Sequence, residues 1–285
     1  MTHTSADQLQ RFSFDETVIR GEIAHLNHSF QDVLNRHRYP SVVARPLGQL
    51  MAATALMSAS LKFKGRLTLQ VRLTGNISLL QAETDEQGQL RAIARYDTEQ
   101  MEKELILDDG QLVITLEPDQ GQRYQGIVAI QGGNIASALE SYFEQSEQLP
   151  TRFWLASDEQ SAAGLMLQRM PETTAASHSP EDWQRIVHLA STVKDQELLT
   201  LDTETLLHRL YHEETLRLYP ASALKFYCTC SKPRLANALR QLGLDELNDM
   251  LTETPSISIN CDFCGQHYSF DRTDVDALFA EQKLH

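Results

Sequence analysis

The sequence predicts an α+β protein: a core of mainly antiparallel strands with packed helices, then a helical linker and a small C-terminal zinc-binding domain. Strand-like runs separated by turn signals fill residues 66–131, without the strand–helix alternation of a parallel sheet. A polar stretch at 172–178 separates them from charged helices. All cysteines follow residue 227. We therefore expect a core over residues 1–171, a linker over 172–225 and a zinc-binding domain over 226–285.

The beginning of the core combines short strands with two helices. Apolar spacing over residues 12–26 predicts strands broken at Gly21, and Ser29 is the expected N-cap of a short helix that ends before Pro40. Residues 46–61 carry no charge and predict a second helix that ends near Lys62. This run is shorter than the roughly 20 residues that span a bilayer, so it indicates a helix buried in the core.

The middle of the chain reads as successive hairpins. Turn dipeptides separate runs of alternating or β-branched residues, which predict strands. A glycine pair then leads into a helix, and two closing strands complete the core. The expected strands lie at 66–73, 77–83, 90–96, 104–107, 112–116, 126–131, 153–155 and 165–167, and the helix lies at 134–146.

The linker and the C-terminal domain have helical signals of their own. Ser179 as N-cap and Pro180 as first residue begin one helix, and a second is expected over 204–214. Because packing supplies most helix stability, we expect these charged helices to depend on docking and to have low intrinsic stability. Beyond Cys230 we expect helices at 233–241 and 245–251, a hairpin from 256–259 and 268–270, and a last helix capped by Thr273.

The four cysteines predict a metal site. Cys228-Thr-Cys230 and Cys261-Asp-Phe-Cys264 supply two thiol pairs, enough for a closed tetrahedral Zn²⁺ site. About sixty residues with few large apolar groups lack a sufficient core, which a metal would supplement. We therefore expect one zinc ion per reduced chain, with ordinary reduced thiols as the alternative and His267 as a bystander.

The same thiols can also undergo redox chemistry. Zinc keeps thiolates deprotonated and therefore nucleophilic toward oxidants. Oxidation to sulfenic acid, followed by attack from a neighbouring thiol, would form disulfides and release the metal. Because the metal supports folding of this domain, its release should unfold the domain. The site is a candidate redox sensor.

Charge narrows the choice of partners. The net charge is −14, and residues 228–285 carry five Lys/Arg against nine Asp/Glu, which disfavours nucleic acid and anionic membranes as partners. The start of the sequence lacks the pattern of a secretory signal, so a cytoplasmic location is expected. His208 and His212 read as a solvated helix face rather than a metal pair, and Gly132-Gly133 as a turn rather than a phosphate loop.

Motifs along nearly the whole chain resemble one family. They lie at residues 11–14, 19–22, 39–40, 61–70, 91–95, 142–151, 163–168 and 170–171, and in Cys228-x-Cys230-Ser-x-x-Arg234 and Cys261-x-Phe263-Cys264-x-x-x-Tyr268-x-Phe270. With these motifs the sequence resembles the 33 kDa heat-shock chaperonin family of redox-regulated bacterial holdases.

The resemblance implies a specific function. It implies an ATP-independent chaperone that is inactive when reduced and zinc-bound and that binds unfolded or misfolded client proteins under oxidative stress. Oxidation would link Cys228 to Cys230 and Cys261 to Cys264, release zinc, unfold the small domain and the linker, and produce a homodimer. An enzyme or a nucleic-acid-binding protein with a purely structural zinc module remains as the alternative, although no nucleophile elbow, acid–base dyad or phosphate loop is evident.

Overall fold

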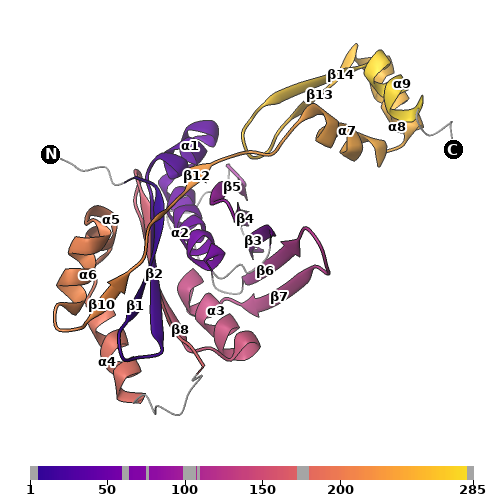
Figure 1. The fold of residues 1–285 in the computed structure, drawn as a ribbon. Helices are drawn as coiled ribbons and strands as arrows, with labels where there is room; N and C mark the ends of the chain where they lie inside the picture. The colour runs from indigo at the N-terminus through magenta and orange to yellow at the C-terminus, as the bar shows by residue number, and fades with distance from the viewer. Residues whose placement is uncertain are drawn as a thin grey trace. The chain divides into compact units, whose positions relative to one another are not determined.

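The computed structural model describes residues 6–59, 64–74, 77–98, 107, 110–171 and 180–280. It separates into two compact units, Met1–Tyr227 and Cys228–His285. Each unit combines helices with antiparallel sheet, as the predicted α+β class requires (Figure 1).

The larger unit contains two six-stranded sheets. The first has the order β10-β1-β2-β9-β8, with β11 also paired to β1, and the second has the order β12-β5-β4-β3-β6-β7. Among the described strands of this unit, all pairings are antiparallel except that of β12 with β5. The strands are β1 Gln8–Phe14, β2 Ile19–Leu26, β3 Gly65–Arg72, β4 Ile77–Asp85, β5 Gln89–Tyr96, β6 Gln111–Pro118, β7 Tyr124–Ala129, β8 Thr151–Ser157, β9 Ala162–Arg169, β10 Leu216–Leu218, β11 Ser222–Ala223 and β12 Lys225–Phe226.

Helix α2, Ser41–Ser58, forms the centre of the larger unit. It contacts strands of both sheets, and its residues Leu47, Leu50 and Met51 are fully buried. The prediction of a buried helix is confirmed, although the helix ends before the expected Lys62. Leu47, Leu50 and Met51 belong to the main hydrophobic cluster, which α1 (His28–His37) and α3 (Ile135–Tyr142) also join.

Two local predictions in this unit are wrong. Gly21 does not break a strand but lies inside β2, where a Cβ atom would come 2.2 Å from Cζ of Phe12. Ser29 does not cap α1. The carboxylate of Asp7 accepts from the backbone N–H groups of Asn27, His28 and Ser29 at 2.6, 2.9 and 2.5 Å. A carboxylate at a helix N-terminus satisfies unpaired donors and complements the helix dipole.

The predicted strand pairs and the helix near 134–146 are present with shifted ends. Asn134 caps α3 by accepting from Ser137 N–H at 2.9 Å, and the helix continues as one π-helical stretch, Phe143–Glu147. The strand expected at 104–107 falls largely outside the described residues, as does the expected cap Ser179.

Residues 180–226 pack onto the rest of the larger unit. Helices α4 (Pro180–Ala190), α5 (Asp195–Thr200) and α6 (Thr203–Tyr211) share a second hydrophobic cluster with β1, β2, β8 and β9. Ile186, Ala190 and Leu206 are its most buried helical members. The sequence predicted helices here, but not α5 or the short strands β10, β11 and β12, which join this stretch to both sheets.

The smaller unit has a helical pair, a hairpin and a last helix. These are α7 (Lys232–Arg240), α8 (Leu244–Glu253), β13 (Ser256–Asn260), β14 (His267–Asp271) and α9 (Arg272–Ala280). All five were predicted. The last helix, however, is capped by Asp271 and not by Thr273: Asp271 and Asp274 exchange backbone-to-carboxylate hydrogen bonds at 2.9 and 3.1 Å. Among the described residues of the smaller unit, six buried side chains form a hydrophobic cluster: Ala236, Leu239, Leu247, Ile257, Phe270 and Val275.

Candidate metal centre

Two backbone segments of the smaller unit carry the four thiols. Cys228 and Cys230 directly precede α7, whose N-cap Ser231 accepts from Arg234 N–H at 3.4 Å. Cys261 and Cys264 lie in the turn between β13 and β14. That turn is closed by Gly265 N–H donating to Cys261 O at 2.8 Å, and Gly265 has a φ of 71°, which a glycine adopts without steric cost.

The four sulfur atoms converge. All Sγ atoms lie within 4.8 Å of one another. The Sγ atoms of Cys228 and Cys261 are 3.6 Å apart, and those of Cys230 and Cys264 are 3.3 Å apart. Four sulfurs around a zinc ion at about 2.3 Å have edges of about 3.8 Å, so the donor set fits a tetrahedral metal. No disulfide joins the four cysteines.

The electrostatics of the cluster favour a cation. Burial raises the pKa of Cys264 to about 12, the backbone N–H of Gln266 opposes this, and hydrogen bonds with the other three thiols add to it. Four thiolates without a counter-charge would repel one another strongly. A divalent cation removes that penalty, because thiolate ligands are deprotonated when they bind metal.

Side chains around the thiols hold the two segments in place. Arg234 Nη1 donates to Thr229 Oγ1 at 2.6 Å, which fixes the residue between Cys228 and Cys230. The hydroxyl of Tyr268 lies 3.2 Å from Sγ of Cys230. The neighbouring thiol raises the pKa of Tyr268 to about 12, so the phenol keeps its proton at neutral pH. In the sequence Tyr268 stood out only as part of a motif, and this contact was not predicted.

The other residues considered from the sequence lie outside the thiol cluster. His267 Nδ1 is 2.9 Å from Asn260 Oδ1 and does not belong to the group of clustered ligands. The rings of His208 and His212 in the larger unit lie 6.3 Å apart, centroid to centroid.

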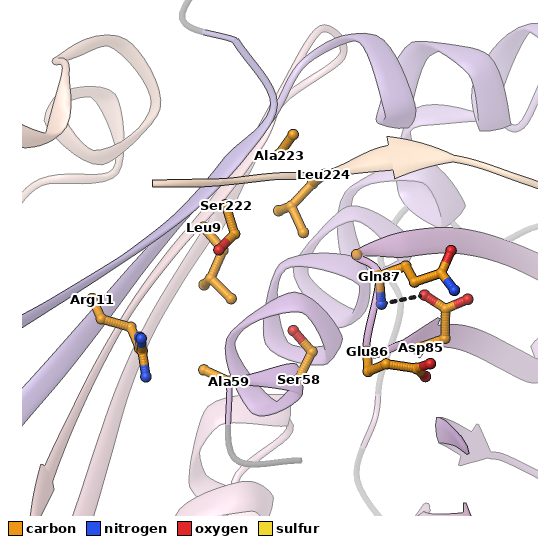
Figure 2. Close-up of a pocket in the computed structure, with 11 residues that line it drawn as sticks. Leu9, Arg11, Ser58, Ala59, Asp85, Glu86, Gln87, Ser222, Ala223 and Leu224 are labelled. Atoms are coloured by element: carbon orange, nitrogen blue, oxygen red, sulfur yellow. Dashed lines mark hydrogen bonds between the residues drawn. The ribbon is translucent and has the colours of Figure 1, made fainter. Parts of the chain in front are cut away.

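The larger unit has a cleft of about 370 Å³ (Figure 2). Arg11 lies on one side of the cleft and the acidic β4–β5 turn on the other. The turn carboxylates bind backbone: Asp85 accepts from Gln87 and Gln89 N–H at 2.9 and 3.0 Å, and Glu86 accepts from Gly65 N–H at 3.1 Å. The lining residues are Leu9, Arg11, Ser58, Ala59, Asp85, Glu86, Gln87, Gly88, Ser222, Ala223 and Leu224. Residues 222–224, which precede β12, therefore form one wall of the cleft.

Among the helices that the structure describes, none has both the length and the apolar character to cross a membrane. Helix α2, whose sequence suggested an apolar run, packs instead against strands of both sheets.

Comparison with known proteins decides the family. A family model described as "Hsp33 protein" matches residues 7–271. The chain belongs to the Hsp33 family. It is 46% identical over 287 residues to the "33 kDa chaperonin" of Pseudomonas aeruginosa strain LESB58, covering 98% of this chain and 96% of that one. It is 46% identical over 281 residues to that of Ectopseudomonas mendocina, covering 96% and 95%.

A solved structure is similar in fold as well. The 33 kDa chaperonin homologue of Thermotoga maritima superposes with a TM-score of 0.80 at 21% identity, over 97% of this chain and 99% of that one. Members of the Hsp33 family are chaperones, so this chain binds unfolded client proteins and is not an enzyme. The resemblance noted from the motifs is confirmed.

Proposed function

We propose that the protein is a redox-regulated, ATP-independent holdase. It is inactive when reduced and zinc-bound, and oxidation activates it to bind unfolding proteins under oxidative stress. The observation that carries the proposal is the convergence of four thiols in a unit whose described residues include a hydrophobic cluster of six buried side chains. The folding of such a unit depends on whether its thiols are reduced and metal-bound or oxidised.

In the reduced state, Cys228, Cys230, Cys261 and Cys264 hold one zinc ion per chain. Zinc, when bound, keeps the sulfurs as thiolates and ties the segment before α7 to the β13–β14 turn. The closed four-sulfur set leaves no open position for catalysis, which fits a structural and regulatory role.

Oxidation by a peroxide or hypochlorous acid then removes the ligands. A thiolate attacks one peroxide oxygen, the O–O bond breaks, and the departing hydroxide takes a proton to become water, leaving a sulfenic acid. A second thiol attacks the sulfenic sulfur, which forms a disulfide and a second water. Cys228–Cys230 and Cys261–Cys264 are the proposed pairs. In the metal-binding arrangement, close neighbours lie across the segments, at 3.6 and 3.3 Å. Once the segment that carries Cys228 and Cys230 separates from the turn that carries Cys261 and Cys264, each cysteine stays close only to the other cysteine of its own segment.

Chain continuity links the thiols to the larger unit. We treat residues 1–171 as core, 172–225 as linker and 226–285 as redox domain. Lys225 and Phe226 pair with β5, and Tyr227 N–H donates to Leu90 O at 2.9 Å, so the paired strand ends next to Cys228. Unfolding of the redox domain frees that strand end, and the linker helices follow.

Release of the linker exposes the client-binding surface. Helices α4–α6 cover apolar side chains of the first sheet, among them Phe12, Phe14 and Ile23. A soluble protein seldom leaves such a patch open, and an unfolding client offers matching apolar surface. We propose that the oxidised form is a homodimer, that the acidic chain does not bind nucleic acid or membranes, and that it acts in the cytoplasm.

The test is suppression of aggregation without ATP, before and after oxidation. The oxidised, metal-free protein should keep a chemically unfolded client soluble, and the reduced zinc-loaded protein should do so poorly. A control sample is oxidised and then reduced again in the presence of zinc. Loss of its activity on reduction would show that the activation is reversible and not the result of oxidative damage. Equal suppression by the reduced and oxidised forms would show that the site is structural only.

A further inference from the structure

We propose that Tyr268 is a positioning residue that donates a hydrogen bond to Cys230 and thereby sets how readily this thiolate is oxidised. This inference rests on the proposed redox function and adds a specific control element to it. The contact joins the Tyr268 hydroxyl to Cys230 Sγ at 3.2 Å.

The direction of the hydrogen bond follows from the chemistry of the sulfur. A metal-bound thiolate has no proton and can only accept, so the phenol donates. The contact therefore has the geometry of an outer-shell donor to a metal ligand. Such donors orient the ligand and tune its electron density.

Packing holds the donor in position. Tyr268 is half-buried against the hydrophobic cluster of the smaller unit and lies opposite Ile259 in the β13–β14 register. Its hydroxyl is thus presented by a paired strand and not by a loop. On the other side, the Ser231 N-cap and the Arg234–Thr229 hydrogen bond fix the backbone that carries Cys230.

The two halves of the site receive different donors. Cys264 accepts from the backbone N–H of Gln266, which no substitution of a side chain removes. Cys230 accepts from a side-chain hydroxyl, which one substitution removes. A substitution of Tyr268 can therefore change the reactivity of Cys230 while all four cysteine ligands stay in place.

The consequence concerns the first oxidation step. A lone pair engaged by the phenol is less available to attack peroxide oxygen. A thiolate becomes less nucleophilic when a hydrogen bond draws on its electron density, and we expect this hydrogen bond to slow the attack roughly three- to tenfold. Tyr268 therefore delays oxidation at Cys230 and raises the dose of peroxide that the switch requires.

Tyr268→Phe is the direct test, because it deletes only the hydroxyl and keeps the ring. Tyr227→Phe is the matched control, since Tyr227 is 48% exposed and adjoins the same cysteine pair in sequence. In the full-length zinc-loaded protein, peroxide should release zinc roughly three- to tenfold faster from Tyr268→Phe than from wild type or Tyr227→Phe. Mass spectrometry should find Cys230 oxidised earlier.

A second readout excludes a loosened fold as the cause. In the cobalt-substituted protein, loss of the donor should move the sulfur-to-cobalt charge-transfer band to longer wavelength, because the sulfur lone pairs rise in energy. Zinc transfer to a chelator without peroxide should be unchanged. An unshifted band with wild-type release rates overturns the proposal, and so does faster release that needs no peroxide. If the wild-type protein keeps its zinc under peroxide, the proposed redox function is wrong. The position of the cobalt band then still shows whether Tyr268 donates a hydrogen bond to Cys230.

Discussion

His25 on β2 donates a hydrogen bond from Nε2 to the backbone carbonyl oxygen of Leu198 in α5, at 3.2 Å. Both residues are almost fully buried, and Nδ1 of the imidazole has no partner among the described residues. The bond joins the strand at the middle of the first sheet to a helix of the proposed linker. It therefore reports whether the linker is docked.

Acid should weaken this docking. Burial lowers the pKa of His25 from its ordinary value of 6.5, while the Leu198 carbonyl and the carboxylates of Asp202 and Asp7 oppose that shift. The unfolded state then binds the proton more readily than the folded state. The free energy of unfolding consequently falls as pH drops below about 6.5, by at most about 1.4 kcal/mol per pH unit.

His25→Gln tests this expectation. Glutamine can keep a donor toward Leu198 but does not titrate. Between about pH 8 and about pH 5.5, hydrogen exchange in residues 180–211 should accelerate in wild type and change little in the variant. His188→Gln, at an exposed position of α4, is the control and should behave as wild type. A variant as acid-sensitive as wild type would assign the effect to other groups.

Glu22 on the same strand should act in the opposite direction. It is fully buried, neither carboxylate oxygen has a hydrogen-bond partner among the described residues, and burial raises its pKa to about 7 despite Arg20 and Arg11 nearby. The folded state keeps the proton that the unfolded state releases near 4.5. The contribution of Glu22 to the free energy of unfolding is therefore most favourable at low pH, and it declines as pH rises from 4.5 toward 7.

Glu22→Gln should stabilise the protein at neutral and alkaline pH, by an amount on the order of 1 to 3 kcal/mol. The gain should vanish well below pH 4.5, where the wild-type carboxyl is protonated in both states. Urea unfolding across this pH range measures the difference, and Glu144→Gln at an exposed position is the control. A stabilisation that does not depend on pH would contradict the assignment to this proton.

The sequence predicted what depends on local pattern. An uncharged run identified α2, and cysteine spacing identified the four converging thiols. Features that depend on long-range contacts were not predictable. The cap of α1 comes from Asp7, some twenty residues away, and β12 has only two residues, too few for any periodicity. The Tyr268 contact depends on a hairpin register that places its hydroxyl beside another segment.

Weaker docking of the linker helices should give partial activity without oxidation. Leu206 is fully buried in the cluster that α4–α6 share with the first sheet. Leu206→Ala leaves a cavity there, at a cost of about 2 to 5 kcal/mol. The reduced, zinc-loaded variant should suppress aggregation of an unfolded client measurably better than wild type. Leu242→Ala, at a 55% exposed leucine, is the control. A destabilised but inactive Leu206→Ala variant would show that linker release does not suffice for activity.

Metal removal should unfold the smaller unit and spare the larger one. The smaller unit has a cluster of six buried residues, whereas the larger has two extensive clusters around α2 and beneath α4–α6. Structural zinc contributes about 10 to 16 kcal/mol of apparent binding free energy in small domains, so its loss outweighs what a small core supplies. Chelation under reducing conditions, or Cys261→Ser, should abolish exchange protection in residues 228–280 while β2, β9 and α2 stay protected. Ser258→Ala, on the hairpin strand before the turn, is the matched control. Persistent protection of α7–α9 after chelation would mean that the apolar cluster alone holds this unit, and oxidation would then need another route to activation.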